Sequence, residues 1–471
     1  MVHQVALTEG FQEENEDARE LSVFRRWFVF SNGGVKATTI SLMTATLGPG
    51  MLAYPDAVQR SGLAWAGIQF LVIILLSFAS IYCLVIASSR IKKFTYGDMA
   101  EVTLGKKYKY LAEFFFFCNN FGSIISYLVL INQNIHSVIG VYNSKYEPLP
   151  AIFSSITSLF WVSLSTVLLI PIVLKKNLKD LKIISMLGLA TILYLAVTIA
   201  LNLLNRDLFD WNKNMDQLVW FKFGGVSVSS SEMLYSFQCQ QYVMLAYHEL
   251  TKASPRRMRK VVLRMIVLCS AIYLVVGICG YISFADKNIS SYKNLFMAYD
   301  LNRNLPISIG MLALTITLVC SLPYCLRPSK ESLYLFLSGY LSKPSDSSSR
   351  LSPAQTKKND QVEIETDPSS RHHVWLSLLT LFMAFSVASV CISFNLSLNA
   401  LMTIVSVFTS PPMCFIFPFL FCLYSKPNET SIGLASMKTT YLLWTGVITA
   451  TMYWISSVFD VLLQLAAGTL G

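Results

Sequence analysis

Long runs of apolar residues dominate this sequence and limit what it can fold into. Of its 471 residues, 54% are hydrophobic and 14% are charged, whereas about a quarter of the residues in a typical soluble domain are charged. The apolar residues form blocks of about 20, the length that a helix needs to cross roughly 30 Å of hydrocarbon. These proportions exclude a soluble globular protein and predict an all-α, polytopic membrane protein.

Eleven apolar blocks predict eleven transmembrane helices. They cover residues 34–57, 63–88, 110–140, 151–174, 183–204, 229–247, 261–284, 307–326, 375–394, 400–424 and 441–465. The predicted organisation has an acidic tail at 1–33, helices one to eight within 34–326, a Ser-rich linker at 327–373 and helices nine to eleven within 374–471. Composition predicts that the tail and most of the linker are disordered.

Two further local expectations concern the ends of these regions. No apolar core follows the initiator Met1, so no cleaved signal peptide is expected. The stretch ESLYLFLSGYL at 331–341, at the start of the linker, predicts a short interfacial helix.

Basic residues gather in alternate loops. The loops after helices two, four, six and eight carry Arg90, Lys92, Lys93, Lys106, Lys107, Lys109, Lys175, Lys176, Lys179, Lys182, Lys252, Arg256, Arg257, Arg259, Lys260, Arg327, Lys330 and Arg371. Cytoplasmic loops carry such an excess, so the N-terminus and the linker are predicted to be cytoplasmic and the C-terminus to lie on the other side. This bias accounts for the net charge of +10 without a nucleic-acid partner, and it places the glycosylation sequon at Asn288 on the outer side.

Other chemistry finds no support in the sequence. The ten cysteines lie within or at the edges of apolar blocks, which is typical of small buried hydrophobic residues. No G-x-x-x-x-G-K-[ST] loop for ATP, no metal-ligand spacing and no placeable Ser/His/Asp set is present. The chain is therefore not expected to be an enzyme or to carry a cofactor or metal, apart from a coupling ion.

The first predicted helix contains Gly48-Pro49-Gly50 near its centre, with Pro55 beyond. A single proline in a membrane helix is typically a kink. Two glycines around a proline instead favour an unwound segment, because they interrupt the hydrogen-bond ladder and free carbonyl and amide groups for a ligand.

The sixth predicted helix has a matching irregularity. Ser236, Gln238, Gln240 and Gln241 interrupt an apolar block, and buried amides mark either contacts between helices or a polar cavity. Helices one and six occupy corresponding positions in two halves of five helices. Broken helices in such positions are typical of inverted-repeat transporters, whose substrate site lies at the bilayer midplane.

Three stretches resemble the amino acid/auxin permease family. TATLGPGMLAYPDAVQRSG is similar to the family's first-helix signature. SFQCQQYVMLAYHELTKASPRRMRKVV and TLVCSLPYCLRPSKESLYLFL resemble the sixth and eighth helices of its sodium-coupled neutral amino acid transporter branch. The resemblance covers the chain apart from the acidic tail and the linker.

This resemblance implies a LeuT-type fold, with two inverted repeats of five helices plus an eleventh helix, and secondary active transport of amino acids. Amides of helix one would receive the substrate carboxylate, and carbonyls of helix six would receive the amino group. The substrate-binding residues implied are Thr46, Leu47, Gly48, Pro49, Gly50, Ser236, Phe237, Gln238 and Cys239. Asn119 and Asn120 in helix three are weaker candidates.

The resemblance also bears on the coupling ion. In the sodium-coupled branch, an asparagine in helix one and a threonine in helix eight contribute to the cation site. Here Thr44 matches the asparagine, and Thr317 to Ser321 replace the family's T-L-T-V-P, so Thr44, Thr317 and Ser321 are the candidate sodium ligands.

Protons are the alternative coupling ion, and a proton pathway needs an acid in the membrane. Asp56, just after Pro55, is the candidate proton-binding acid. Alternatively, it is an interfacial carboxylate in contact with water on the outer side. Glu113, Glu232 and Asp460 lie nearer helix ends and are expected to be interfacial.

Three functions remain to be separated. The first is an amino-acid symporter or exchanger, and the second is a non-transporting amino-acid sensor on an internal membrane. The third, an ion channel, has the least support because no filter-like loop is present. The sequence does not distinguish the plasma membrane from a vacuolar or lysosomal membrane.

Overall fold

A computed structural model describes residues 34–145, 181–204, 215–341, 370–394, 396–425 and 437–466, together with Ser163, Leu164, Thr166, Val167 and Ile170. The helices of these parts are α2 (Val35–Thr46), η1 (Pro49–Ala53), α3 (Tyr54–Ser61), α4 (Leu63–Ile91), α5 (Tyr96–Thr103), α6 (Lys106–Lys145), α9 (Leu181–Leu204), α11 (Val226–Ser236), α12 (Gln240–Glu249), α13 (Pro255–Ser283), η2 (Ile289–Ser291), η3 (Leu295–Ala298), α14 (Leu305–Leu341), α15 (Ser370–Ser393), α16 (Leu398–Pro411), η4 (Pro412–Ile416), α17 (Phe417–Tyr424) and α18 (Met437–Ala466).

Eight helical stretches in these parts of the chain are long and apolar enough to cross a membrane: α4, α6, α9, α13, α14, α15, the continuous run from α16 to α17, and α18. Their outward faces expose large apolar side chains, such as Leu75 at 69% and Phe382 at 67%. Such exposure is costly in water and favourable in lipid. The protein is therefore an all-helical, multi-pass membrane protein.

The other three predicted helices are accounted for differently. The first and sixth are each split into shorter helices, α2 with α3 and α11 with α12. Most of the fourth, at 151–174, lies outside the described residues, as do the acidic tail, most of the linker and Gly471.

The eighth helix differs from its prediction. We expected it to end at residue 326 and a separate interfacial helix to span 331–341. Instead α14 runs without interruption from Leu305 to Leu341, with Pro323 and Pro328 inside it. Each proline removes one backbone donor, and neighbouring helices can compensate for that loss within a membrane.

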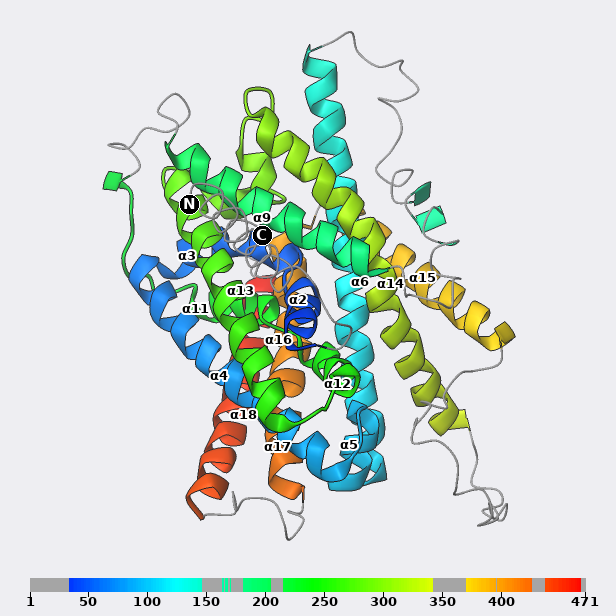
Figure 1. The fold of residues 1–471 in the computed structure, drawn as a ribbon. Coiled ribbons are helices and arrows are strands. Elements are labelled where there is room, and N and C mark those ends of the chain that lie inside the picture. Colours follow the sequence, from blue (N-terminus) through cyan, green and yellow to red (C-terminus); the bar gives the residue numbers. More distant parts are fainter. Residues whose placement is uncertain are drawn as a thin grey trace, which may run out of the picture.

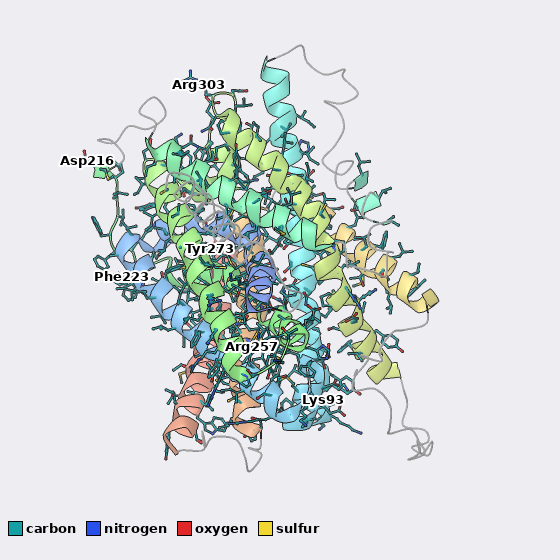
Figure 2. All side chains as sticks on the ribbon, in the orientation of Figure 1. Lys93, Asp216, Phe223, Arg257, Tyr273 and Arg303 are labelled. Atoms are coloured by element: carbon teal, nitrogen blue, oxygen red, sulfur yellow. The ribbon has the colours of Figure 1, made fainter. Side chains whose placement is uncertain are left out.

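The two split helices lie at the centre of the molecule (Figure 1). α13 packs against α2 and α3, while α11 packs against α3 and α16. Figure 2 places Lys93 and Arg257 at one end of the molecule and Asp216 and Arg303 at the other. Two of the loops predicted to be cytoplasmic, those after helices two and six, thus lie toward the same end.

Candidate functional site

The first candidate segment is the interruption between α2 and α3. The backbone bond from the Leu47 amide to the Met43 carbonyl, 2.7 Å long, closes α2. Leu47 and Gly48 are then extended, with ψ of 96° and −155°. Helical structure resumes at Pro49, which begins the 3₁₀ turn η1. The first helix is therefore broken at Leu47 and Gly48, at the start of the predicted Gly48-Pro49-Gly50 segment, whose last two residues are helical.

The second segment separates α11 from α12. The last turn of α11 tightens, because the Phe237 and Gln238 amides bond the carbonyls of Leu234 and Tyr235 three residues back. α12 begins at Gln240. The sixth helix is therefore also broken, at the polar interruption that the sequence indicated.

The two breaks meet at Gly50 and Ser236. The Ser236 hydroxyl donates to the Gly50 carbonyl over 3.0 Å. A Cβ at Gly50 would lie 2.7 Å from the Ser236 Oγ and 3.0 Å from its Cα, closer than ordinary van der Waals contact. Glycine is required here because the two backbones approach so closely.

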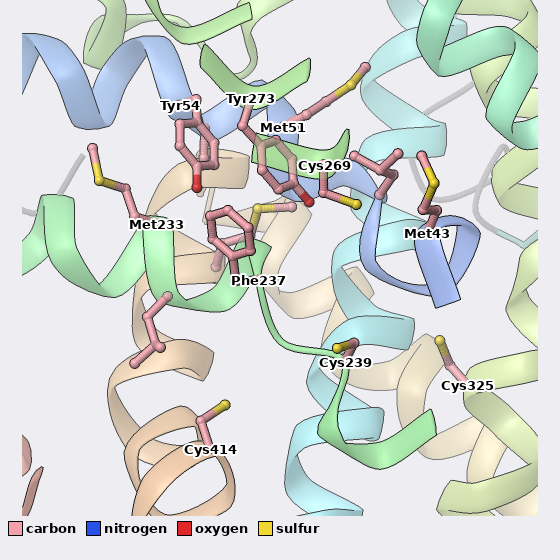
Figure 3. Packing of buried hydrophobic residues seen from close by; sticks show 14 of the residues in the cluster. Met43, Met51, Tyr54, Met233, Phe237, Cys239, Cys269, Tyr273, Cys325 and Cys414 are labelled. Carbon is pink, nitrogen blue, oxygen red and sulfur yellow. The ribbon is translucent and has the colours of Figure 1, made fainter. Parts of the chain in front are cut away.

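A tyrosine on α13 joins both breaks. The Tyr273 hydroxyl lies 2.9 Å from the Thr46 carbonyl oxygen and 2.7 Å from that of Ser236, so its single proton is shared between the carbonyls that end α2 and α11. The Tyr273 ring stacks on Tyr54 at 4.6 Å and meets Phe237 edge-on at 5.1 Å; Figure 3 shows the three rings together. Sequence reasoning missed this residue, since a tyrosine within an apolar helix carries no distinguishing signal.

A polar cavity of about 30 Å³ lies beside the breaks. Its walls come from helices one, three, six and eight, and consist of Ala45, Thr46, Gly48, Pro49, Gly50, Asn119, Ser123, Tyr127, Tyr235, Ser236, Gln238, Gln241, Tyr242 and Cys325. This free space matches about one water molecule, so an amino acid needs the walls to move apart.

The cavity includes six of the nine predicted substrate residues: Thr46, Gly48, Pro49, Gly50, Ser236 and Gln238. The other three, Leu47, Phe237 and Cys239, are buried in the hydrophobic core instead. They belong to the broken segments, but their side chains pack against other helices.

Helix three contributes more than its sequence suggested. Asn119 lies in the cavity wall, where it donates to Gln241 at 2.6 Å and accepts from Thr409 at 3.0 Å. Its neighbour Asn120 instead donates back to the Phe116 carbonyl of its own helix. The three cavity tyrosines, Tyr127, Tyr235 and Tyr242, were not anticipated.

Two candidate sodium ligands lie near one another. A Cβ built on Gly188 of α9 would be 2.9 Å from the Thr317 methyl carbon and 3.8 Å from that of Thr44. The Thr44 hydroxyl donates to the Ile40 carbonyl and the Thr317 hydroxyl to the Ala313 carbonyl. Helices α2, α9 and α14 therefore converge where the sequence placed the pair, with Ser321 one turn beyond Thr317 on α14.

Three of the four acidic residues, all except the half-buried Asp460, do not match the interfacial environment considered for them. Asp56 is fully buried rather than wetted at an interface, and it pairs with Arg60 at 2.9 Å. Glu113 and Glu232 are 4% and 1% exposed, so the prediction that they are interfacial is wrong. The Gly97 amide donates to Glu113. Position along an apolar block does not reveal burial by neighbouring helices.

The sequence is similar to a known protein family and to several characterised proteins. The profile of a family described as "Transmembrane amino acid transporter protein" matches residues 31–463. The chain is 23% identical over 319 residues to sodium-coupled neutral amino acid transporter 7 of Danio rerio, covering 66% of this chain and 67% of the relative. It is 25% identical over 307 residues to vacuolar amino acid transporter 7 of Saccharomyces cerevisiae, covering 62% and 57%.

The extent of these alignments is limited. Together with a relative from Plasmodium falciparum, they span 48% to 67% of the relatives' own lengths. The structure of MhsT in complex with L-phenylalanine superposes with a TM-score of 0.59 at 13% identity, covering 90% of this chain and 98% of MhsT. The chain therefore shares the fold of MhsT, the LeuT fold.

Proposed function

The chain belongs to the transmembrane amino acid transporter family, a family of transporters rather than enzymes, and from this premise we propose that it is a secondary active transporter of amino acids. The substrate would bind in the polar cavity between the broken helices. The observation that carries this proposal is the meeting of the two breaks at Gly50 and Ser236 beside that cavity.

The chemistry of the helix ends suits an amino acid. The N-terminal end of η1, at Pro49, carries partial positive charge and favours a carboxylate. The C-terminal end of α11, at Ser236, presents carbonyl groups that favour an ammonium group. Thr46, Gly48, Gly50 and Gln238 complete the proposed site for the carboxylate and ammonium groups of the substrate.

The helix order is compatible with the finer architecture implied by the resemblance. We assign α2/α3 and α11/α12 to corresponding positions of two inverted five-helix repeats, with α18 as the eleventh helix. We further propose that the tail at 1–33 and the linker at 327–373 are cytoplasmic, and that the protein resides in the plasma membrane or in a vacuolar or lysosomal membrane.

Transport would be coupled to a cation. Thr44 and Thr317 approach the same residue, Gly188, with their methyl groups. A sodium position between α2 and α14, with Ser321 as a further oxygen ligand, would require both hydroxyls to turn away from the carbonyls of their own helices. Hydroxyl oxygens suit this hard cation. The second coupling ion we consider is the proton.

Uptake into proteoliposomes tests the function. Purified protein should accumulate at least one radiolabelled L-amino acid from a panel of alanine, glutamine, leucine, arginine and glutamate when a sodium or pH gradient is imposed. Empty liposomes serve as the control. Binding of an amino acid without flux under either gradient would overturn the transporter and support the sensor.

A further inference from the structure

Six side chains form a polar network one helical turn from the cavity, of which four are buried and two, Arg60 and Ser290, are half-buried. Asp56 and Arg60 come from α3, Glu232 from α11, Ser290 from η2, and Asn399 and Thr403 from α16. Glu232 lies one turn before Ser236 on α11, and the Ser236 hydroxyl lies 3.0 Å from the Gly50 carbonyl oxygen and 2.9 Å from the main-chain carbonyl oxygen of Glu232.

Asp56 has a full set of partners. It is completely buried, and its carboxylate receives bonds from Arg60 at 2.9 Å, Ser290 at 2.6 Å and Asn399 at 3.0 Å. The Asp56 carboxyl group therefore has its own cation and a partner on each oxygen.

Glu232 has fewer hydrogen-bond partners than Asp56. It is 1% exposed, its Oε1 accepts one bond from Thr403 at 3.1 Å, and its Oε2 has no partner among the described residues. Arg60 interacts electrostatically with both Glu232 and Asp56, so one cation faces two carboxylates. A second buried negative charge without its own cation costs several kcal/mol.

Two acceptor oxygens of the network have no hydrogen-bond donor among the described residues. Asn399 uses its amide nitrogen for Asp56, while its Oδ1 is a second buried acceptor without a partner in the described parts of the chain. A proton on Glu232 would remove the excess charge and convert one acceptor oxygen into a donor.

Among the described residues, the elements packed on α11 offer Glu232 no other counter-charge. The elements packed on α11 are α3, α4, α16, α18 and η1. α3 contributes Asp56 and Arg60, and α18 contributes Tyr453, whose hydroxyl lies 3.2 Å from that of Ser231. Toward α11, α4 and α16 present residues that do not titrate, namely Gln69, Thr403 and Ser406, and η1 carries no titratable side chain.

We propose that Glu232 is a proton-binding site, and that its protonation closes the packing of α3, α11 and α16 on the outer side of the cavity. This proposal rests on the proposed transport function and names the proton as a coupling ion. When Glu232 is ionised, repulsion from Asp56 and the need for hydration favour separation of these helices. When it is protonated, the network closes beside the substrate, so proton and amino acid are carried in the same closed state.

Sodium-free proteoliposomes test the proposal with the panel amino acid that the wild type takes up fastest. Accumulation by the wild type should rise up to about tenfold per unit of pH gradient, acid on the side of η2. Glu249→Gln, a control at an exposed position, should show the same pH response as the wild type. In Glu232→Gln net uptake should lose this pH response, and exchange of external for internal amino acid should fall less than net uptake. A pH response that survives in Glu232→Gln would overturn the proposal.

Thr403→Val provides a milder variant in case Glu232→Gln does not insert. It removes the donor to Oε1 and so favours the protonated carboxyl. The pH of half-maximal uptake should therefore move upward. An unchanged midpoint would count against Glu232 as the titrating group.

A readout independent of transport separates the two proposals. A carboxyl that favours its protonated form more when folded than when unfolded loses its stabilising contribution as pH rises. The unfolding temperature of detergent-purified wild type should therefore fall relative to that of Glu232→Gln between pH 5 and pH 8. Absence of flux with this difference intact would reject only transport, whereas parallel pH profiles would reject the proton site.

Discussion

The close approach of Gly50 to Ser236 predicts the effect of a single methyl group. In Gly50→Ala, the new Cβ would lie 2.7 Å from a hydroxyl and 3.0 Å from a backbone carbon. The side-chain oxygen can rotate away, but the backbone carbon moves only with α11. Overpacking of this kind costs about 1–3 kcal/mol, which lowers the population of the closed arrangement by about 5- to 150-fold.

Initial rates of amino-acid uptake, normalised to the amount of inserted protein, measure this effect. Gly67→Ala is the matched control, because a Cβ at Gly67 of α4 meets nothing within 4 Å. Its uptake should equal that of the wild type. Adding Ser236→Gly to Gly50→Ala removes the contacting side chain and should restore part of the rate, limited by the helix cost of a glycine.

Uptake by Gly50→Ala at the rate of Gly67→Ala would refute the reasoning. It would mean that the two breaks separate far enough during transport for their contact to have no influence. Loss of uptake without any recovery in the double variant would instead attribute the defect to the contact with the Ser236 Cα, which Ser236→Gly leaves in place, rather than to the contact with its side chain.

Other predictions concern the surrounding residues. Tyr273→Phe leaves two buried carbonyls without their shared donor, so the free energy of unfolding should fall by about 1–3 kcal/mol and uptake should slow. An unchanged unfolding midpoint would contradict the role of the Tyr273 hydroxyl in joining the two breaks. If sodium binds between α2 and α14, Thr44→Val and Thr317→Val should each raise the sodium concentration for half-maximal uptake while the pH response stays; equal sodium curves would exclude that site. Sided labelling should reach a tag at Met1 only from the cytoplasm and one at Gly471 only from the opposite side; a shared side would refute the odd helix count.

The local breaks could be predicted from the sequence because their causes are local. Gly48, Pro49 and Gly50 interrupt a helix wherever it packs, since proline lacks an amide proton and glycine favours no single conformation. Apolar block length likewise indicated the membrane-spanning helices, because the bilayer imposes one thickness on all of them. Alternating loop charge is a property of the same kind, and its prediction of which loops are cytoplasmic awaits sided labelling.

Burial and partnership were decided only by the tertiary structure. Asp56 and Glu232 occupy apolar stretches that read as helix ends, yet packing of α3, α11 and α16 removes both from solvent. Tyr273 acquires its role from two carbonyls that lie 227 and 37 residues away along the chain. Leu47, Phe237 and Cys239 were predicted to bind substrate, but their side chains pack in the hydrophobic core. Such contacts depend on how distant helices cross, and no local pattern of residues encodes that crossing.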